Sequence, residues 1–377
     1  MDFNKINKIL DGEPKFRAKQ IGQLIWRDLI EDWDEATTLP VGLREKLKAE
    51  CPLKIKAEVF EEKDDKSAKA LITLADGLNV ETVLMRHTLR QAQGIKNIRN
   101  TVCVSSQIGC PLGCVFCATG KMGLKRNLSA SEISEQVLFW ARWLNTKSSH
   151  PEESSDEGSP ANAGSHTREI PRYARNDKID ENSDRVNNIV FMGMGEPFLN
   201  YDNVLEAVKI LNDDNLLGIG ARHISISTAG VVEGIERMAE DMPQINLAIS
   251  LHAPNDELRQ ELMPIAKKYP LAAVLTTAKD YVAKTNRKLM FEYIMIKGVN
   301  DSAGHAKELA GLMSNPLFFV NLIAYNATGD LVPSELAQIK KFKDILMKAG
   351  VQALERYKFG QDIKGACGQL AGKGIIE

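Results

Sequence analysis

Residues 101–126 read TVCVSSQIGCPLGCVFCATGKMGLKR, and three cysteines in this stretch are spaced as Cys110-x3-Cys114-x2-Cys117. Three thiolates so close together on a glycine-rich loop can bind three irons of a [4Fe–4S] cluster. No fourth ligand stands nearby, so one iron would stay open. An open iron can chelate the amino and carboxylate groups of S-adenosylmethionine (SAM). The stretch therefore predicts a cluster bound by Cys110, Cys114 and Cys117, with SAM beside it.

Three other uses of these cysteines fit the spacing less well. A zinc site usually has four ligands, and the chain has no second CxxC pair and no HxxxH motif. A thioredoxin-like pair of Cys114 and Cys117 would leave Cys110 without a role. Buried structural thiols are the usual fate of scattered cysteines, but these three lie within eight positions.

The composition is that of a soluble globular protein. The chain has 377 residues, of which 44% are hydrophobic and 26% charged, enough for one large domain and a small one. No apolar run approaches the roughly 20 residues that a membrane span needs, and nothing at the N-terminus resembles a signal peptide. We expect a cytoplasmic protein with reduced thiols and no membrane contact, and for that reason no structural disulfides.

Charge is distributed unevenly along the chain. The formal net charge of −2 argues against a protein that coats nucleic acid in bulk. Between Thr82 and Ser131, however, there is no acidic residue, and the charged side chains are Arg86, Arg90, Lys96, Arg99, Lys121, Lys125 and Arg126. This distribution favours equally a phosphate-rich partner at the cysteine loop and a solvated basic face.

Local patterns divide the chain into four parts. Residues 1–55 have apolar side chains at helical spacing and predict a small helical accessory domain. Residues 56–100 form a short β linker region, with alternation over 56–87 and a second, shorter insertion at 88–100. Residues 101–350 form the main domain, interrupted at 145–185 by a polar, Ser/Asn/Pro-rich insertion that predicts disorder. Residues 351–377 are a C-terminal segment that carries Cys367.

The main domain alternates strands with helices. Strands are predicted near 101–105, 188–194, 223–229, 245–251, 289–296 and 318–325. Helices are predicted near 130–144, 202–213, 231–241, 271–285, 302–314 and 334–349. This repeat indicates an α/β fold with a parallel sheet and helices outside it. In such folds the chemistry lies at the C-terminal ends of the strands, and the cysteine loop follows the first strand.

Polar groups and glycines follow the later strands too. Met192–Pro197 reads MGMGEP, in which Gly195 allows close approach of a ligand and Glu196 could accept bonds from the ammonium of SAM. Ser227, Ser250, His252 and Asn326 also end strands, and such groups suit ribose, adenine and carboxylate recognition. Each has an ordinary alternative, a tight turn for the glycine motif and a hydrogen-bonded strand end for the histidine.

The chain resembles the RlmN/Cfr family of radical-SAM RNA methyltransferases in four motifs that follow one another in the sequence. They are the cysteine loop, GMGEP, SLHA at 250–253 and DIxxACGQL at 362–370. The N-terminal module and Val80-Glu81-Thr82 resemble the RlmN branch. The resemblance covers nearly all of the chain outside 88–100 and 145–185. It implies a partial (βα)6 barrel with an N-terminal helical accessory domain, and methylation of C2 of an adenosine in the peptidyl-transferase region of 23S rRNA and of the adenosine 3′ of the anticodon in tRNA.

The resemblance also implies roles for single residues. One SAM methylates Cys367, and a second SAM, bound to the open iron of the [4Fe–4S] cluster, is cleaved to a radical that activates the methyl group for addition to C2. Cys103 matches the cysteine that then forms a disulfide with Cys367, and Glu81 matches a proton acceptor. The ordinary alternatives are spare buried thiols and a carboxylate on the strand surface. The residues that match SAM contacts are Gly195, Glu196, Ser227, Ser250, Leu251, His252 and Asn326.

Two departures and two alternative functions remain open. The family commonly has an arginine before Gly360 and a proline after Asn326, where this chain has Phe359 and Ala327. The alternatives are methylation of C8 of the same rRNA adenosine, as in the Cfr branch, and a noncatalytic iron–sulfur RNA-binding protein. As partners we expect 23S rRNA, tRNA and a flavodoxin-type reductant, and the protein itself is expected to be a monomer.

Overall fold

The computed structural model describes residues 3–64, 66–90, 96–149, 185–356, 360 and 362–372. The predicted strands of the main domain are all present and form one parallel array in chain order. They are β4 (Lys96–Cys103), β7 (Val186–Phe191), β8 (Ile224–Thr228), β9 (Asn246–Ser250), β10 (Leu289–Met295) and β11 (Phe318–Ala324). The α/β fold and its parallel sheet are therefore confirmed.

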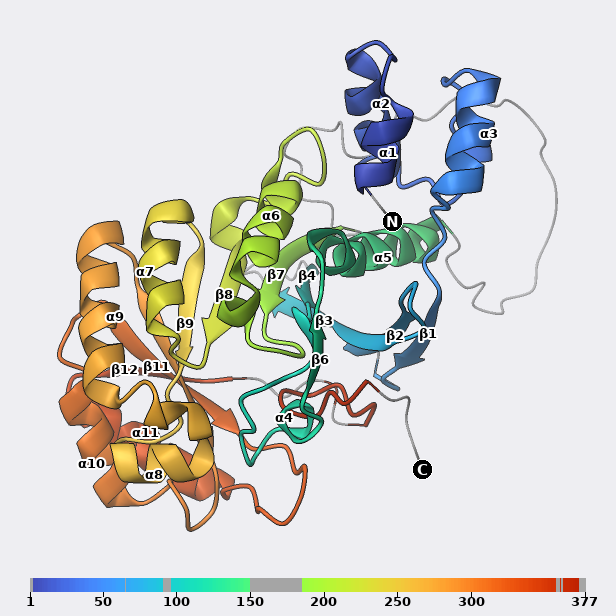
Figure 1. The fold of residues 1–377 in the computed structure, drawn as a ribbon. Helices are drawn as coiled ribbons and strands as arrows, with labels where there is room; N and C mark the ends of the chain where they lie inside the picture. Colours follow the sequence, from blue (N-terminus) through green and yellow to red (C-terminus); the bar gives the residue numbers. More distant parts are fainter. Residues whose placement is uncertain are drawn as a thin grey trace.

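The predicted helices follow these strands and cover one side of the sheet (Figure 1). They are α5 (Ala130–Ser149), α6 (Tyr201–Asn212), α7 (Val232–Asp241), α9 (Leu271–Thr285), α10 (Ala303–Leu312) and α11 (Leu336–Lys348). A side-chain cap begins α10, where the Ser302 hydroxyl accepts a bond of 3.1 Å from the amide of His305. A further short helix, α8 (Asp256–Leu262), precedes α9.

The sheet is open rather than a closed barrel. Its ten strands run in the order β1-β2-β3-β4-β7-β8-β9-β10-β11-β12, so β1 and β12 are its two edges. The first three, β1 (Ala57–Glu61), β2 (Ser67–Thr73) and β3 (Asn79–Arg90), are antiparallel to their neighbours, as the alternation predicts. The last, β12 (Gln352–Glu355), is a parallel strand that the prediction missed because three of its four side chains are exposed.

Two boundaries differ from the sequence prediction by five residues each. The first parallel strand begins at Lys96 rather than near 101, because β3 and β4 continue their pairing as far as Arg90 and Lys96. Residues 88–90 and 96–100 thus extend a hairpin, and 91–95 lie outside the described residues. Helix α5 continues to Ser149, five residues beyond the predicted end at 144. The rest of the predicted insertion, 150–184, lies outside the described residues.

The N-terminal residues form the predicted helical module. Its helices are α1 (Phe3–Ile9), α2 (Phe16–Trp26) and α3 (Val41–Glu50), with a short 3-10 helix, η1 (Trp33–Glu35), between the last two. They lie together above α5 and α6 in Figure 1. Trp33 is fully buried and donates from its indole N–H to the carbonyl of Cys51, 2.7 Å away. Cys51 is itself buried, as a structural thiol is expected to be.

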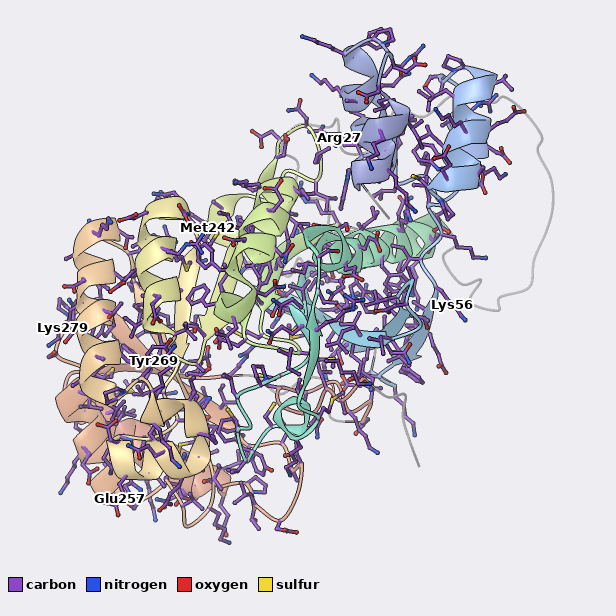
Figure 2. The ribbon with its side chains drawn as sticks, viewed as in Figure 1. Arg27, Lys56, Met242, Glu257, Tyr269 and Lys279 are labelled. Atoms are coloured by element: carbon purple, nitrogen blue, oxygen red, sulfur yellow. The ribbon has the colours of Figure 1, made fainter. Side chains whose placement is uncertain are left out.

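Two arginines form hydrogen bonds between the module and the main domain. Arg27, labelled in Figure 2, extends from the end of α2 and donates to the carbonyl of Asp214 in the loop after α6. Arg142 of α5 is buried and donates to the carbonyls of Ile30 and Leu53. The hydrophobic core accordingly runs without a break from the N-terminal helices into the main domain. Within the described ranges, no helix has the length and apolar character that crossing a membrane requires.

Candidate active site

A small hairpin shapes the cysteine loop. Strand β5 (Gln107–Gly109) pairs with β6 (Leu124–Asn127), and the loop between them contains the three cysteines and the short helix α4 (Ala118–Lys121). Gly109 has a φ of 77°, and a Cβ there would lie 1.8 Å from the carbonyl oxygen of Gly123. Only glycine therefore fits at this position. The next amide, that of Cys110, donates to the same Gly123 oxygen at 3.2 Å.

The three thiols face one cavity of about 140 Å³. Burial, with a smaller contribution from electrostatic repulsion by Glu196 and Cys117, raises the pKa of Cys110 to about 12. Burial and the neighbouring thiols also raise the pKa of Cys114. Cys110 and Cys114 are buried next to the half-buried Cys117, so these two thiols need a nearby positive charge to become thiolates.

This donor set fits an iron–sulfur cluster better than a single ion. Among the described residues, no group of three or more His, Cys, Asp or Glu side chains is close enough to hold one metal ion. A cluster separates its cysteine ligands more widely, because each thiolate binds a different iron. Cys110, Cys114 and Cys117 on the wall of one cavity are consistent with that arrangement.

The carboxyl ends of the parallel strands form another part of the cavity wall. Gly195, Glu196, Ser227, Ser250 and His252 all line the cavity, although they come from the ends of three strands. Gly195 has a φ of 101°, and a Cβ there would lie 2.6 Å from the side chain of Gln107. The hydroxyl oxygens of Ser227 and Ser250 are 3.4 Å apart. The structure thus brings together five of the seven residues that match SAM contacts.

Glu196 is a buried acceptor at the centre of this wall. One carboxylate oxygen accepts from the amide of Ala229 at 2.7 Å, and the other accepts from the amide of Phe198 at 3.1 Å. Burial raises the pKa of Glu196 to about 7, although these amides oppose the shift. An ammonium group that entered the cavity would compensate the buried charge, so the contact expected with SAM is chemically reasonable.

His252 is a neutral imidazole in a strained backbone conformation. Its φ is 61°, which is uncommon for a residue other than glycine. The Nδ1 atom accepts from the amide of Ile294 at 3.1 Å, so the ring proton is on Nε2. Burial lowers the pKa of His252 to about 3. The ring also packs edge-on against Phe116 of the cysteine loop, with 4.9 Å between centroids.

Two expected SAM contacts lie elsewhere. Leu251 has a fully buried side chain in the main core, and its backbone amide donates to the carbonyl of Glu292 at 3.0 Å. Asn326 does not line the cavity of the cluster cysteines, and its side-chain amide donates to the carbonyl of Cys367 at 3.2 Å. In this structure Asn326 holds the C-terminal segment.

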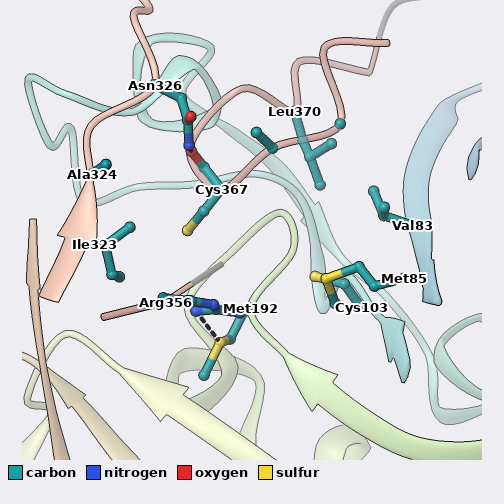
Figure 3. Close-up of a pocket in the computed structure, with 12 residues that line it drawn as sticks. Val83, Met85, Cys103, Met192, Ile323, Ala324, Asn326, Arg356, Cys367 and Leu370 are labelled. Carbon is teal, nitrogen blue, oxygen red and sulfur yellow. Dashed lines mark hydrogen bonds between the residues drawn. The ribbon is translucent and has the colours of Figure 1, made fainter. Parts of the chain in front are cut away.

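Cys103 and Cys367 line a second cavity of about 50 Å³ (Figure 3). Cys103 ends β4, whereas Cys367 comes from the C-terminal segment, and all six cysteines are free thiols. Burial raises the pKa of Cys103 to about 12. Although Cys367 is exposed at the surface, desolvation by the surrounding protein raises its pKa, and the guanidinium of Arg356 opposes this shift. The two cysteines that were predicted to act as a pair are therefore brought to one cavity, without a bond between them.

The sequence prediction did not identify Arg356, Met192 or Glu292 as site residues. The Arg356 guanidinium donates to the sulfur of Met192 at 3.1 Å and lies 3.9 Å from the carboxylate of Glu292. Both cavities are lined by Met192 and Arg356. Arg356 lies directly after β12, and a position at the end of a strand could have marked it as a site residue. It was missed because β12 was not recognised in the sequence.

Glu81 is buried and lines neither cavity. Its carboxylate pairs with the ammonium of Lys69 at 2.8 Å and accepts from the amides of Ala371 and Gly372 at 2.6 and 3.0 Å. The alternative of a carboxylate on the strand surface is therefore wrong. Both carboxylate oxygens of Glu81 already have partners in this structure. The role of proton acceptor, which the resemblance implies for Glu81, therefore stays a prediction.

The structure describes one of the two positions at which this chain differs from the family it resembles. Ala327 lies in a loop that is bound to the cysteine loop: the Thr328 hydroxyl donates to the carbonyl of Phe116, and Lys121 donates to the carbonyl of Thr328, both at 3.0 Å. Proline is therefore not needed to hold this loop in place. Phe359 lies outside the described residues.

Comparisons with known proteins agree with this geometry. The Radical SAM superfamily matches residues 160–310. A probable dual-specificity RNA methyltransferase RlmN from Dictyoglomus thermophilum is 40% identical, over 98% of this chain and 94% of its own length. The corresponding protein from Chloroflexus aurantiacus is 41% identical over 96% and 88%.

One solved structure resembles the whole chain. It is a radical SAM methyltransferase from Sphaerobacter thermophilus, 37% identical in sequence, and the alignment covers 99% of this chain and 98% of that one with a TM-score of 0.83. The likeness therefore extends over both the N-terminal module and the C-terminal segment.

Proposed function

The chain belongs to the RlmN family of radical SAM RNA methyltransferases, and from this premise we propose that it methylates C2 of adenosine in 23S rRNA and in tRNA. The rRNA target is the adenosine of the peptidyl-transferase region, and the tRNA target is the adenosine 3′ of the anticodon. The proposed route uses a methylated Cys367 and two SAM molecules per turnover. The enzyme is proposed to act as a cytoplasmic monomer.

The position of Cys367 is the observation that supports this route. Cys367 lines the cavity of the cluster cysteines and also the cavity of Cys103. A methyl group on its sulfur could therefore be received from SAM on one side, and the sulfur could be attacked by a second thiol on the other.

The chemistry of adenine explains why a cysteine would be needed. C2 is an electron-poor carbon and does not attack the methyl group of SAM. The Cys367 thiolate can do so: a new S–CH3 bond forms, the sulfonium–methyl bond breaks, and S-adenosylhomocysteine leaves. When bound, the [4Fe–4S] cluster would supply the electron that cleaves the second SAM, and a flavodoxin-type protein is the proposed donor. Cys110, Cys114 and Cys117 would hold this cluster.

Other residues of the chain would complete the cycle. Glu196, Ser227, Ser250 and His252 would orient SAM at the strand ends that line the cavity. In the covalent intermediate that links the Cys367 sulfur through a methylene group to C2, the Cys103 thiolate would attack that sulfur. The S–S bond forms, the bond between the sulfur and the methylene carbon breaks, and this carbon takes a proton, so that the methylated base leaves. The adenosine must leave its stack to reach the cavity, at a cost of a few kcal/mol.

The test is nucleoside mass spectrometry of rRNA and tRNA from a host without its own enzyme, complemented with this protein. We expect 2-methyladenosine in both RNA pools. Chromatography separates the 8-methyl isomer, whose appearance would instead indicate the Cfr-like reaction. Absence of both isomers from a host that contains cluster-loaded protein would contradict a methyltransferase.

The same assay tests the route through Cys367. Cys367→Ala should abolish methylation but retain the cluster, whereas Cys51→Ala, at a buried cysteine of the N-terminal module, should leave methylation unchanged. Methylation by the Cys367→Ala variant at the wild-type level would rule out the methyl-cysteine route.

A further inference from the structure

A buried ion pair connects the antiparallel edge of the sheet to the C-terminal segment. Lys69 of β2 and Glu81 of β3 are each 1% exposed, and their charged groups are 2.8 Å apart. In the register of these strands Lys69 is opposite Val83 and Leu71 is opposite Glu81. Since alternate residues share a face, Lys69 and Glu81 are diagonal neighbours on one side of the sheet.

Both oxygens of the Glu81 carboxylate have polar partners in this environment. One oxygen takes the Lys69 ammonium, and the other accepts from the backbone amides of Ala371 and Gly372. Burying an ion pair seldom adds net stability, since desolvation offsets the attraction. Removing one partner, by contrast, leaves an uncompensated buried charge. The pair is therefore better explained by the segment of backbone that Glu81 binds than by a gain in stability alone.

This segment is the backbone that follows Cys367. The carbonyl of Cys367 accepts from Asn326, and the carbonyl of Gly368 accepts from the amide of Ala118 at 2.8 Å. The carbonyl of Leu370 accepts from the Thr119 hydroxyl at 2.6 Å. These bonds fix the segment to the cysteine loop and to Asn326. At the far end of the segment, Glu81 fixes it to β3.

We propose that Lys69 is a positioning residue, which holds the Glu81 carboxylate against the amides of Ala371 and Gly372 and so keeps the Cys367 thiol between the two cavities. These four residues are called the latch below. The existence of the latch is independent of the proposed function, but its consequence for methyl transfer to Cys367 rests on that function.

The latch acts through contacts that are far apart in sequence. Glu81 and Ala371 are 290 residues apart. Without the Lys69 charge, the carboxylate would be buried without a counter-ion and would turn toward water, which breaks its bonds to the two amides. The segment would then leave its site more often, although the rest of the sheet stays folded. Cys367 is already exposed while the segment is bound. In the released segment its thiol could be reached from all sides, and it would be less well aligned with SAM.

Two variants break the latch in different ways. Lys69→Met removes the cation from its buried site and retains most of the side-chain volume. Ala371→Pro removes the amide that makes the shorter bond to Glu81, and it leaves both buried charges in place. Lys147→Met is the matched control for the first variant, because it removes a lysine from an exposed ion pair with Glu61 on β1.

The first measurement is the alkylation rate of Cys367 by iodoacetamide, with peptide mass spectrometry to identify the site. Cluster-reconstituted protein without SAM is used, so that Cys110, Cys114 and Cys117 are protected and Cys367 carries a free thiol. Both latch variants should be alkylated at Cys367 at least about fivefold faster than the wild type and the control. Iron content and thermal midpoint are recorded for every protein.

The second measurement is a single turnover in which SAM methylates Cys367, followed by intact mass. The rate should fall about tenfold in both latch variants, because a misplaced nucleophile loses its alignment. The SAM concentration that gives half the maximal rate should not change, since the SAM wall of the cavity is intact. A general loss of structure would change both.

The outcomes separate the latch from the proposed function. Cys367 reactivity within twofold of the wild type in both variants would overturn the latch. A change in Ala371→Pro alone, in a folded Lys69→Met protein, would show that Glu81 holds the segment without Lys69 and would overturn its positioning role. If Lys69→Met does not fold, Ala371→Pro decides whether the segment is held at Glu81. A Lys69→Met/Glu81→Met double variant then replaces the single variant, because it has no unpaired buried charge. The double variant must show the same faster alkylation of Cys367.

Absence of Cys367 methylation in the wild type, together with faster alkylation in the latch variants, would contradict the proposed function and support the latch.

Discussion

At the residue scale, a single glycine determines whether the cysteine loop can form. A side chain at Gly109 would collide with the backbone of Gly123, which belongs to the end of the same loop. Backbone cannot move aside as the end of a flexible side chain can. The cluster site therefore depends on a residue that makes no contact with a cofactor through a side chain.

We predict that Gly109→Ala loses the cluster but retains the fold. The new Cβ would push the two ends of the loop apart, so that the three cysteines no longer face one cavity. Iron content after anaerobic reconstitution should fall below about a tenth of the wild-type value, with the far-ultraviolet circular dichroism unchanged. Gly42→Ala is the control, because a Cβ there has no neighbour within 4 Å. Wild-type iron content in Gly109→Ala would contradict this account of the loop.

Arg356 is the second decisive residue, because it adjoins both cavities. Its guanidinium is the positive group that lowers the pKa of Cys367, whereas desolvation, Glu292 and Cys117 raise it. The thiolate of Cys367 is the nucleophile in the proposed route. Removal of Arg356 should consequently shift the population of Cys367 toward the unreactive thiol.

We predict that Arg356→Met moves the pH profile of Cys367 alkylation to higher pH. A raised pKa leaves less thiolate at any pH below it, so the rate near pH 8 should fall several-fold and recover as the pH increases. The measurement is the alkylation rate from pH 7 to pH 10 in cluster-loaded protein. Arg237→Met, on the surface of α7, is the control. A profile identical to that of the wild type would show that Arg356 does not act on the thiol.

At the element scale, helix α5 joins the N-terminal module to the sheet. Arg142 is 5% exposed and donates to the carbonyls of Ile30 and Leu53, which lie before and after α3. Burial lowers the pKa of Arg142 to about 10, so the side chain stays charged at neutral pH. One buried cation thus holds two segments of the module against the helix.

We predict that Arg142→Met lowers the free energy of unfolding by about 2 kcal/mol, because two buried carbonyls lose a charged donor. Hydrogen exchange should become faster around residues 30 and 53, whereas β8 to β10 should stay protected. The surface variant Arg237→Met, which loses an exposed pair with Asp202, should cost less than about 1 kcal/mol. Unchanged exchange around residues 30 and 53 would mean that the module is held mainly by its apolar contacts.

At the scale of the whole molecule, the basic stretch of the sequence is divided among different places. Arg126 pairs with Glu132 and Asp76, and Arg99 lines a cavity away from the cysteine loop. Lys121 and Lys125 lie at the cysteine loop, where Lys121 holds the neighbouring Thr328 carbonyl. The stretch is therefore partly structural, and only some of its charges are near the candidate site.

We predict that Lys125 and Lys364 bind RNA phosphates at the mouth of the site. Both are exposed: Lys125 lies on β6, directly after the cysteine loop, and Lys364 lies three residues before Cys367. Each change to alanine should weaken tRNA binding and reduce the salt slope of log affinity by about 1. Lys279→Ala on α9, far from the loop in Figure 2, should change neither. Equal salt slopes for all four proteins would place the RNA on another surface.

Much of this molecule could be predicted from the chain alone, since the signals are local. The strand–helix alternation, the spacing of Cys110, Cys114 and Cys117, and the polar groups at strand ends are each readable within a short window. Hydrophobic period and strand order then place the strand ends together at one edge of a parallel sheet. Short or exposed elements such as β12 lack such a period and were missed.

The sequence by itself therefore determined the α/β fold, the cysteine loop and the family to which the chain belongs. Only the tertiary structure decided that Glu81 is buried with Lys69, that Arg356 adjoins both cavities, and that Leu251 and Asn326 do not line the cavity of Cys110, Cys114 and Cys117. The physical reason is that burial and pairing depend on contacts between different elements, in one case 290 residues apart, and such contacts leave no periodic trace in the sequence. A glutamate on a strand looks the same whether it faces water or holds the backbone of the C-terminal segment.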